Sequence, residues 1–148
     1  MGLIDEIGAG PLALDTVPFI YFIEAHPRFL PLLEPVFETV DRGRLAAVTS
    51  SLTLLEVLVV SYRAGDAPLA DRYEQILTRS RGLTLIDIDH GQLRAAAQLR
   101  AVYPNVRTPD AIQLAAALSA RCSALLTNDR ELPAIGGLRV LQLRDYVR

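Results

Sequence analysis

The chain has 148 residues and a formal net charge of −2, with 51% hydrophobic and 22% charged residues. This length predicts one domain over residues 1–148 that buries roughly two thirds of its unfolded surface, and the composition excludes a disordered chain. Apart from two histidines every basic residue is Arg, so Lys is absent. That excludes Walker phosphate loops, Schiff-base chemistry, and phosphatases or receiver domains with an essential Lys.

The single cysteine and the N-terminus give further limits. Cys122 ends an apolar helical segment, so we expect a buried, inert thiol and no disulfide. The first residues carry Asp5 and Glu6 and lack a basic segment, which does not fit a signal peptide. Because no apolar run approaches the ~20 residues of a membrane span, we expect a cytoplasmic protein without membrane contact.

Short apolar runs alternate with helical periodicity along the chain. This alternation predicts an α/β fold with a mainly parallel sheet of five strands covered by helices on both faces. The expected strands are Pro11–Asp15, Leu45–Thr49, Leu83–Ile88, Ala124–Thr127 and Leu138–Leu143. The expected helices are Pro18–Ala25, Leu32–Asp41, Leu52–Ala64, Ala67–Arg81, Gly91–Val102 and Pro109–Ala120. Either Ser50 or Ser51 can cap the third helix, and Thr108 is expected to cap the last.

Glu56 is the acid that a local role explains least well. It lies in a helix that is apolar nearly all round, in the segment SLTLLEVLVVSYR. A buried carboxylate without a partner costs several kcal/mol, so we expect a cation, a metal ion or a strong hydrogen-bond network beside it. A structural ion pair with one of the arginines is the alternative.

Three more acids stand where strands end or helices begin. Asp15 ends the first strand, Asp129 follows the fourth, and Asp110 lies in the first turn of the last helix. Ligands in open α/β sheets bind outside the carboxyl ends of the strands. Taken alone, Asp15 fits a helix cap and Asp129 fits a turn into Arg130.

Taken together, the four acids predict a common site. Carboxylates crowded at one edge repel one another and need a cation to compensate. Oxygen ligands favour Mg²⁺ or Mn²⁺ over Zn²⁺, and the isolated His26 and His90 are expected in loops or at the surface. Asp87 and Asp89, in LTLIDIDHG, are assigned to turn and cap roles instead.

At these residues the chain resembles the PIN-domain family, and most of all the VapC-type toxin ribonucleases of toxin–antitoxin pairs. The matching segments are LALDT, SSLTLLEV, TPDAIQLAAAL and LLTNDREL, which occur in the family's order and together span nearly the whole chain. The resemblance implies a three-layer α/β/α sandwich with a Rossmann-like sheet and a Mg²⁺- or Mn²⁺-dependent endoribonuclease. It also implies a homodimer held in check by a small antitoxin that covers a hydrophobic groove.

By motif matching, the resemblance assigns roles to individual residues. Asp15 and Asp110 would be the main metal ligands, with Glu56 and Asp129 completing the acidic pocket. The residues expected to support this pocket are Thr16, Thr127 and Asn128. Hydrolysis by a metal-activated water would leave 5′-phosphate products on the RNA.

Two alternatives from other classes stay open. A catalytically idle PIN-like binding module would act through its partner surface alone. A phosphatase-like hydrolase would use Asp15 as the nucleophile. Such an enzyme usually requires an acid at position 17, which is Val here, and a downstream Lys, which the chain lacks. The aromatic residues Phe19, Tyr21, Phe22 and Phe29 are expected to be mostly core, with a partner groove as the other possibility.

Overall fold

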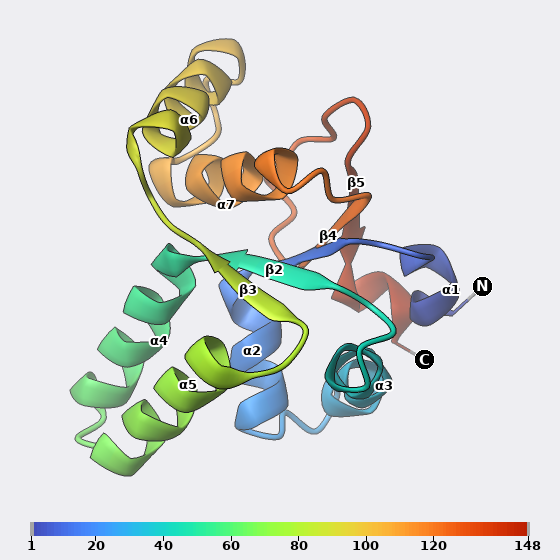
Figure 1. Ribbon diagram of the computed structural model, residues 1–148, viewed down its shortest axis with the longest axis vertical. Helices are drawn as coiled ribbons and strands as arrows, with labels where there is room; N and C mark the ends of the chain where they lie inside the picture. The colour runs from blue at the N-terminus through green and yellow to red at the C-terminus, as the bar shows by residue number, and fades with distance from the viewer. Residues whose placement is uncertain (1, 148) are drawn as a thin grey trace.

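A sheet of five parallel strands forms the centre of the protein, for which a computed structural model describes residues 2–147 (Figure 1). The strand order is β3-β2-β1-β4-β5, and all four neighbouring pairs are parallel. The strands are β1 (Leu12–Leu14), β2 (Ala47–Ser50), β3 (Leu83–Ile86), β4 (Ala124–Thr127) and β5 (Arg139–Gln142). The predicted α/β fold is confirmed, and the sheet is parallel throughout.

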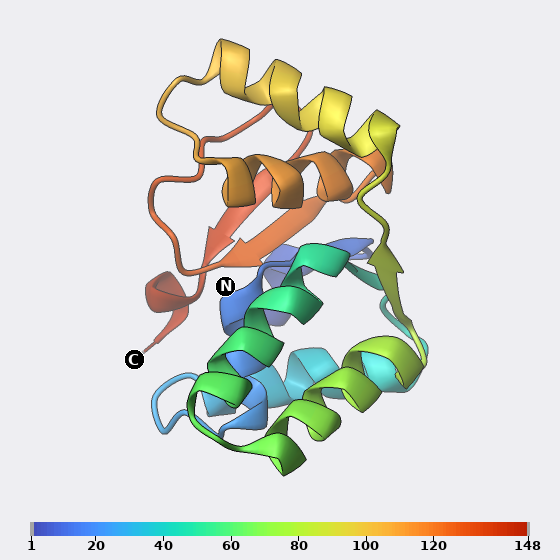
Figure 2. The same ribbon diagram turned by 90° about the vertical axis from the view of Figure 1, so that its left-hand side faces the viewer.

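Helices cover both faces of this sheet, as Figures 1 and 2 show. Two helices lie on one face, α6 (His90–Val102) and α7 (Thr108–Ser119). The opposite face carries α2 (Thr16–Ile23), α3 (Leu30–Asp41), α4 (Ser51–Arg63) and α5 (Ala67–Arg79). Two short elements complete the chain, α1 (Leu3–Ile7) and the 3-10 helix η1 (Leu143–Tyr146). The predicted three-layer arrangement is therefore present.

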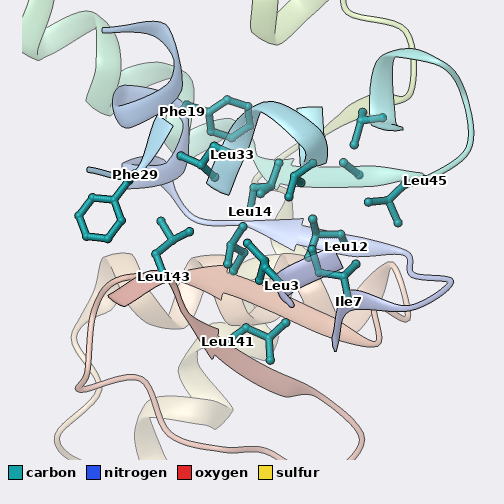
Figure 3. Close-up of a cluster of buried hydrophobic side chains, with 14 of the residues drawn as sticks. Leu3, Ile7, Leu12, Leu14, Phe19, Phe29, Leu33, Leu45, Leu141 and Leu143 are labelled. Carbon is teal, nitrogen blue, oxygen red and sulfur yellow. The ribbon is translucent and has the colours of Figure 1, made fainter. Parts of the chain in front are cut away.

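The side-chain alternation of the strands divides the core into two clusters. In β1, Leu12 and Leu14 belong to the cluster under α2 and α3, whereas Ala13 belongs to the cluster under α7. Figure 3 shows the first cluster, where Leu12 and Leu14 lie among side chains from α1, α3 and the C-terminal segment. Strand β1 is therefore central and packs against apolar side chains on both of its faces. This packing holds the carboxyl end of the strand in a fixed position.

The order of the strands places the point where the sheet changes direction beside β1. The chain runs from β1 outward to β2 and β3, then returns across β1 to add β4 and β5 on its other side. In such sheets the crevice at the carboxyl ends of the two diverging strands is where ligands bind. Here those ends belong to β1 and β4, and they are followed by Asp15 and by Asn128 and Asp129.

Most element boundaries differ from the sequence prediction by one or two residues, and two elements were missed. Strand β4 was predicted correctly, whereas β3 ends at Ile86 because Asp89 already caps α6 through the backbone N–H of Gln92. The cap role predicted for Asp89 is thus confirmed. Helices α1 and η1 were not predicted, since both are too short to show periodicity.

The prediction of Thr108 as the cap of the last helix is wrong. Helix α7 begins at Thr108 itself, with Arg107 at the cap position and no side-chain capping bond. The Thr108 hydroxyl instead accepts a hydrogen bond from Arg100, at 2.9 Å. Of the two residues predicted as possible caps of α4, Ser50 is the cap and accepts the N–H of Leu52, whereas Ser51 is the first residue of the helix. Within residues 2–147, no helix has the length and apolar character to cross a membrane.

Candidate acidic site at the carboxyl edge of the sheet

Asp15 follows β1 directly and caps helix α2. Its Oδ1 accepts the backbone N–H of Thr16 at 2.8 Å, and its Oδ2 accepts the hydroxyl of Thr127 at 2.7 Å. The ladder between β1 and β4 sets Leu14 against Leu126, which brings the next residues of both strands side by side. Both carboxylate oxygens of Asp15 are therefore held by short hydrogen bonds.

Thr127 connects two of the acids through one hydroxyl. It ends β4, is fully buried, and also accepts the backbone N–H of Asp129 at 3.0 Å. The hydroxyl donates its proton to Asp15 and accepts from the loop that carries Asp129. The role of Thr127 in supporting the site stays a prediction.

Glu56 reaches the same edge from helix α4. Its Oε1 accepts the hydroxyl of Thr16 at 2.6 Å, and Thr16 is the first residue of α2. The ion pairs found among residues 2–147 do not include Glu56, so its partner here is a hydroxyl and not an arginine. Thr16 thus lies between two acids, bonded to Asp15 by its backbone and to Glu56 by its side chain.

A buried polar network that the sequence analysis missed lies behind Thr16. Thr53 in α4 is fully buried and accepts the amide of Gln113 in α7 at 2.8 Å. Its hydroxyl also lies 2.6 Å from that of Thr49 and 3.4 Å from that of Thr16. The available signal was spacing: Thr53 stands three residues before Glu56, and Gln113 three after Asp110, which puts each on the same helix face as its acid.

Asp110 and Asp129 form the other part of the site, and the side chain of one arginine lies close to both carboxylates. Asp110 is in the first turn of α7 and its side chain is 11% exposed. The guanidinium of Arg107 approaches Asp110 Oδ2 at 3.6 Å and Asp129 Oδ2 at 3.8 Å. Asp129 Oδ1 accepts the N–H of Glu131 at 2.9 Å, which is the turn role considered for it.

The pKa values show that three of these acids interact. Burial raises the pKa of Asp15, the bonds from Thr127 and Thr16 lower it, and the charge of Asp129 raises it. The pKa of Asp110 rises to about 6, first through burial and then through repulsion from Asp129, which Arg107 only partly offsets. Repulsion from Asp15 adds to this rise. Negative charge in the site therefore exceeds the positive charge that the protein supplies.

All four acids line one cavity of about 460 Å³. Its donors are carboxylate, hydroxyl and amide oxygens, a set that suits Mg²⁺ or Mn²⁺, and its excess negative charge also fits a divalent cation. Within residues 2–147, however, no three His, Cys, Asp or Glu side chains form a group that could hold a metal ion in the observed arrangement. The donor chemistry fits a metal ion, and some movement of side chains is needed to bind one.

Other residues named from the sequence lie elsewhere. The structure does not bring Asn128 to the acids, because its side-chain oxygen accepts the backbone N–H and the Nε–H of Arg144, both at 3.1 Å. His26 lies in the loop after α2, and His90 is exposed at the start of α6. Cys122 is buried, which raises the pKa of its thiol to about 11.

Comparisons with known proteins agree with this fold. The PIN domain, as a sequence family, matches residues 12–138. No curated protein matches the chain significantly. Among solved structures, VapBC2 from Rickettsia felis bound to a promoter DNA fragment has a TM-score of 0.69 at 18% identity, over 88% of this chain and 97% of that chain.

Two further structures show the same fold. The DNA-bound VapBC of Salmonella typhimurium has a TM-score of 0.61 at 24% identity, over 89% of this chain and 97% of that one. VapC20 of Mycobacterium tuberculosis, a toxin that cleaves the sarcin–ricin loop, has a TM-score of 0.62 at 14% identity, over 77% and 86%. At these identities the likeness concerns the fold.

Proposed function

The chain belongs to the PIN-domain family, and we propose that it is a Mg²⁺- or Mn²⁺-dependent endoribonuclease, the toxin of a toxin–antitoxin pair. One observation supports the activity above the others. Asp15, Asp110 and Asp129 come from three separate segments, interact electrostatically, and line one cavity at the carboxyl edge of the sheet. The similar VapC20 is a toxin that cleaves the sarcin–ricin loop, which supports RNA as the substrate class.

In this proposal Asp15 and Asp110 are the main metal ligands, and Glu56 and Asp129 complete the pocket. A divalent cation would lower the pKa of water and offset the charge of the phosphate. Thr127 orients Asp15, while Thr16 holds Oε1 of Glu56 and leaves Oε2 free to accept a proton from the attacking water. If the attacking water forms the new P–O bond and the bond from phosphorus to the 3′-oxygen breaks, one product carries a 5′-phosphate and the other a 3′-hydroxyl.

Two arginines that line the cavity are candidates for contact with RNA phosphates. Arg107 lies at its rim beside Asp110, and Arg63 lies on α4 seven residues after Glu56. Seven residues correspond to about 10 Å along a helix and return to the same face. RNA crossing the cavity would meet Arg107, the acids and then Arg63, with Val59 between the last two.

An antitoxin partner is proposed because several similar structures are toxin–antitoxin complexes. A second cavity, of about 390 Å³, lies between α3 and α5 and is lined mainly by apolar side chains, among them Phe22, Phe37 and Ile76. This cavity supports a site for an apolar segment of the antitoxin. Leu55 and Tyr62 on α4, which are 59% and 61% exposed, support a homodimer.

The test compares the wild type with Asp15→Asn and Asp110→Asn on total RNA, with Mg²⁺, with Mn²⁺ and with EDTA. Either substitution should reduce cleavage by at least about 100-fold, since each removes one ligand charge. Asp87→Asn is the matched control, because Asp87 is exposed and does not line the cavity. The products are then ligated with and without prior dephosphorylation to detect 5′-phosphates.

The outcomes separate the proposal from its alternatives. An idle binding module would leave RNA uncut under every condition, and a phosphatase-like enzyme using Asp15 would not need Asp110. Cleavage that persists in EDTA, or in either Asn variant at the level of Asp87→Asn, would contradict the metal mechanism.

A further inference from the structure

Arg107 is the one cation that the described residues 2–147 place in an ion pair with any of the four acids. It is the cap residue of α7, three positions before Asp110, and its backbone is extended. From there its guanidinium lies against Asp110 through Nε and against Asp129 through Nη2. A single side chain therefore contacts acids from two different segments of the site.

The contacts of Arg107 are loose. Its distances to the two carboxylates, 3.6 Å and 3.8 Å, exceed the ~2.7–2.9 Å of charge-assisted hydrogen bonds. Its side chain is 67% exposed, so little packing holds it. Arg144 shows the contrast, because its guanidinium makes two hydrogen bonds to Asn128 and its backbone N–H makes a third. Arg107 is held in the site by charge and can leave without disturbing the core.

The guanidinium of Arg107 occupies the position beside Asp110 and Asp129 that a metal ion would take. The carboxylates of Asp110 and Asp129 are not grouped with a third acid closely enough to hold an ion as they stand. The Oδ2 atoms that face Arg107 are the oxygens that could turn toward a cation, since Oδ1 of Asp129 is bonded to the N–H of Glu131. Two positive charges at these oxygens would repel each other, so occupation by one opposes the other.

We propose that Arg107 is an internal counter-ion that a divalent cation must displace from Asp110 and Asp129 before the site is complete. The inference rests on the proposed metal-dependent function and adds how the protein regulates metal binding at that site. Without metal, Arg107 partly neutralises the two acids and lowers the affinity of the site for cations. When metal enters, the guanidinium leaves the carboxylates and stays at the rim of the cavity, where substrate arrives.

The experiment measures Mn²⁺ binding by isothermal titration calorimetry, without RNA, for the wild type, Arg107→Ala and Arg130→Ala. Arg130 is the matched control, because it adjoins Asp129 and is exposed, and none of the ion pairs described in residues 2–147 involves it. Both variants lose one positive charge near the site, so the control measures the general effect of net charge. Arg107→Lys, which keeps the charge, is a second comparison.

Arg107→Ala should bind Mn²⁺ about tenfold more tightly than the wild type, as expected from losing two partly exposed ion pairs that compete with the metal. Arg130→Ala should change the affinity by less than about twofold, because the charge that it loses is exposed and screened. Arg107→Lys should stay close to the wild type. Thermal unfolding of each variant checks that the fold is intact, which the exposure of both arginines leads us to expect.

The outcomes distinguish the two proposals. If the wild type binds Mn²⁺ and Arg107→Ala binds no more tightly than Arg130→Ala, the counter-ion role is overturned and the metal site stands. If Arg107→Ala binds more weakly, the arginine supports the metal site and the inference is again overturned. If none of the proteins binds Mn²⁺, the proposed function fails together with the inference. Binding by Arg107→Ala alone would support both.

Discussion

The two halves of the acidic site are held in different ways. Asp15 and Glu56 accept short hydrogen bonds from threonine hydroxyls, at 2.7 Å and 2.6 Å, and Thr53 lies buried behind them. Asp110 and Asp129 meet an exposed arginine at 3.6 Å and 3.8 Å. The first half is fixed before any ligand arrives, and the second half is held by charges that can rearrange.

This difference follows from where each half stands in the fold. Asp15 directly follows β1 and Thr127 ends β4, and the backbone ladder of these two neighbouring strands continues to Asp15, whose N–H donates to the carbonyl of Leu126. Asp110 lies in the first turn of a helix and Asp129 lies in a turn, and the exposed side chain of Arg107 reaches both. A site built in this way would keep two of the proposed ligands preorganised and leave the other two free to rearrange around a cation.

The largest effect on the fixed half is expected from Thr127→Val. The substitution keeps the shape but removes the hydroxyl that donates to Asp15 and accepts from the N–H of Asp129. Cleavage should fall by about 100-fold, as for other residues that orient a metal ligand. The pKa of Asp15 should rise further because a bond that lowers it is lost, so the acid limb of the pH–rate profile should move to higher pH.

Thr127→Ser is the control for this change. It retains the hydroxyl and should keep cleavage within about threefold of the wild type, since the donor and acceptor are preserved. Equal loss of activity in both variants would show that the methyl group and not the hydroxyl matters. A profile whose acid limb stays in place in Thr127→Val would contradict the link to Asp15.

The adjustable half is tested next, through stability and without RNA. The pKa of Asp110 in the folded protein is about 6, above its ordinary value of 3.8. Below pH ~3 the carboxyl is protonated in the folded and unfolded chains alike. As the pH rises from 3.8 to about 6 the unfolded chain releases this proton before the folded one does, so the folded state loses stability, and the loss is complete above pH 6. Asp110→Asn removes this loss and should raise the free energy of unfolding at pH 7.5 by about 2 kcal/mol, a net figure that already contains the attraction to Arg107.

Urea unfolding of the wild type and Asp110→Asn at pH 4 and pH 7.5, with EDTA, measures this difference. The two proteins should have similar stability at pH 4 and differ at pH 7.5. Added Mg²⁺ should stabilise the wild type more than the variant, because only the wild type keeps the full ligand set. A variant that is less stable than the wild type at pH 7.5 would show that the ion pair with Arg107 outweighs burial and repulsion.

The contrast between the halves also explains what the sequence could predict. Strand runs such as Ala124–Thr127 were predicted because buried parallel strands are apolar without interruption, and the acids that follow them were predicted because parallel strands end at one edge. The sequence placed Asp15, Glu56, Asp110 and Asp129 in one site, and the structure brings all four to one cavity. Their roles as metal ligands are still a prediction.

The hydrogen-bond partners could not be predicted in the same way. Thr53 and Gln113 lie 60 positions apart, and they meet only because α4 and α7 approach each other at the edge of the sheet. Asn128, like Thr127, is a polar residue at the end of a buried strand, so the sequence does not distinguish the two. Its side chain bonds to Arg144 instead, which belongs to η1, and this helix is too short to be predicted from periodicity. Arg107 lies beside its acids in sequence, yet its reach to Asp129 depends on the path of the turn after β4.

A smaller effect is expected where the fixed half depends on Thr16. Thr16→Val removes the donor to Glu56 Oε1 and leaves the backbone bond to Asp15 intact. Cleavage should fall about tenfold, less than for Thr127→Val, because only one acid loses its partner. Mn²⁺ affinity measured by calorimetry should change little if Glu56 acts mainly on the proton of the water.

Thr16→Ser serves as the matched control and should behave like the wild type. If Thr16→Val lowers Mn²⁺ affinity as much as it lowers cleavage, Glu56 is a metal ligand and not a proton acceptor. If Thr16→Val has no effect on either quantity, the hydrogen bond at 2.6 Å does not position Glu56 for its role.

The smallest effect is expected beyond both halves, at Arg63. This residue lines the cavity two helical turns from Glu56, too far for contact with the reacting phosphate but within reach of a neighbouring one. Arg63→Ala should raise the KM for RNA about threefold with little change in kcat. The slope of log KM against log salt concentration should fall by the amount expected for the loss of about one phosphate contact. Arg79→Ala, on the exposed end of α5 and outside the cavity, should leave both unchanged. If Arg63→Ala lowered kcat and left KM alone, Arg63 would act on the chemistry, and the rigid half of the site would extend further along α4 than its hydrogen bonds indicate.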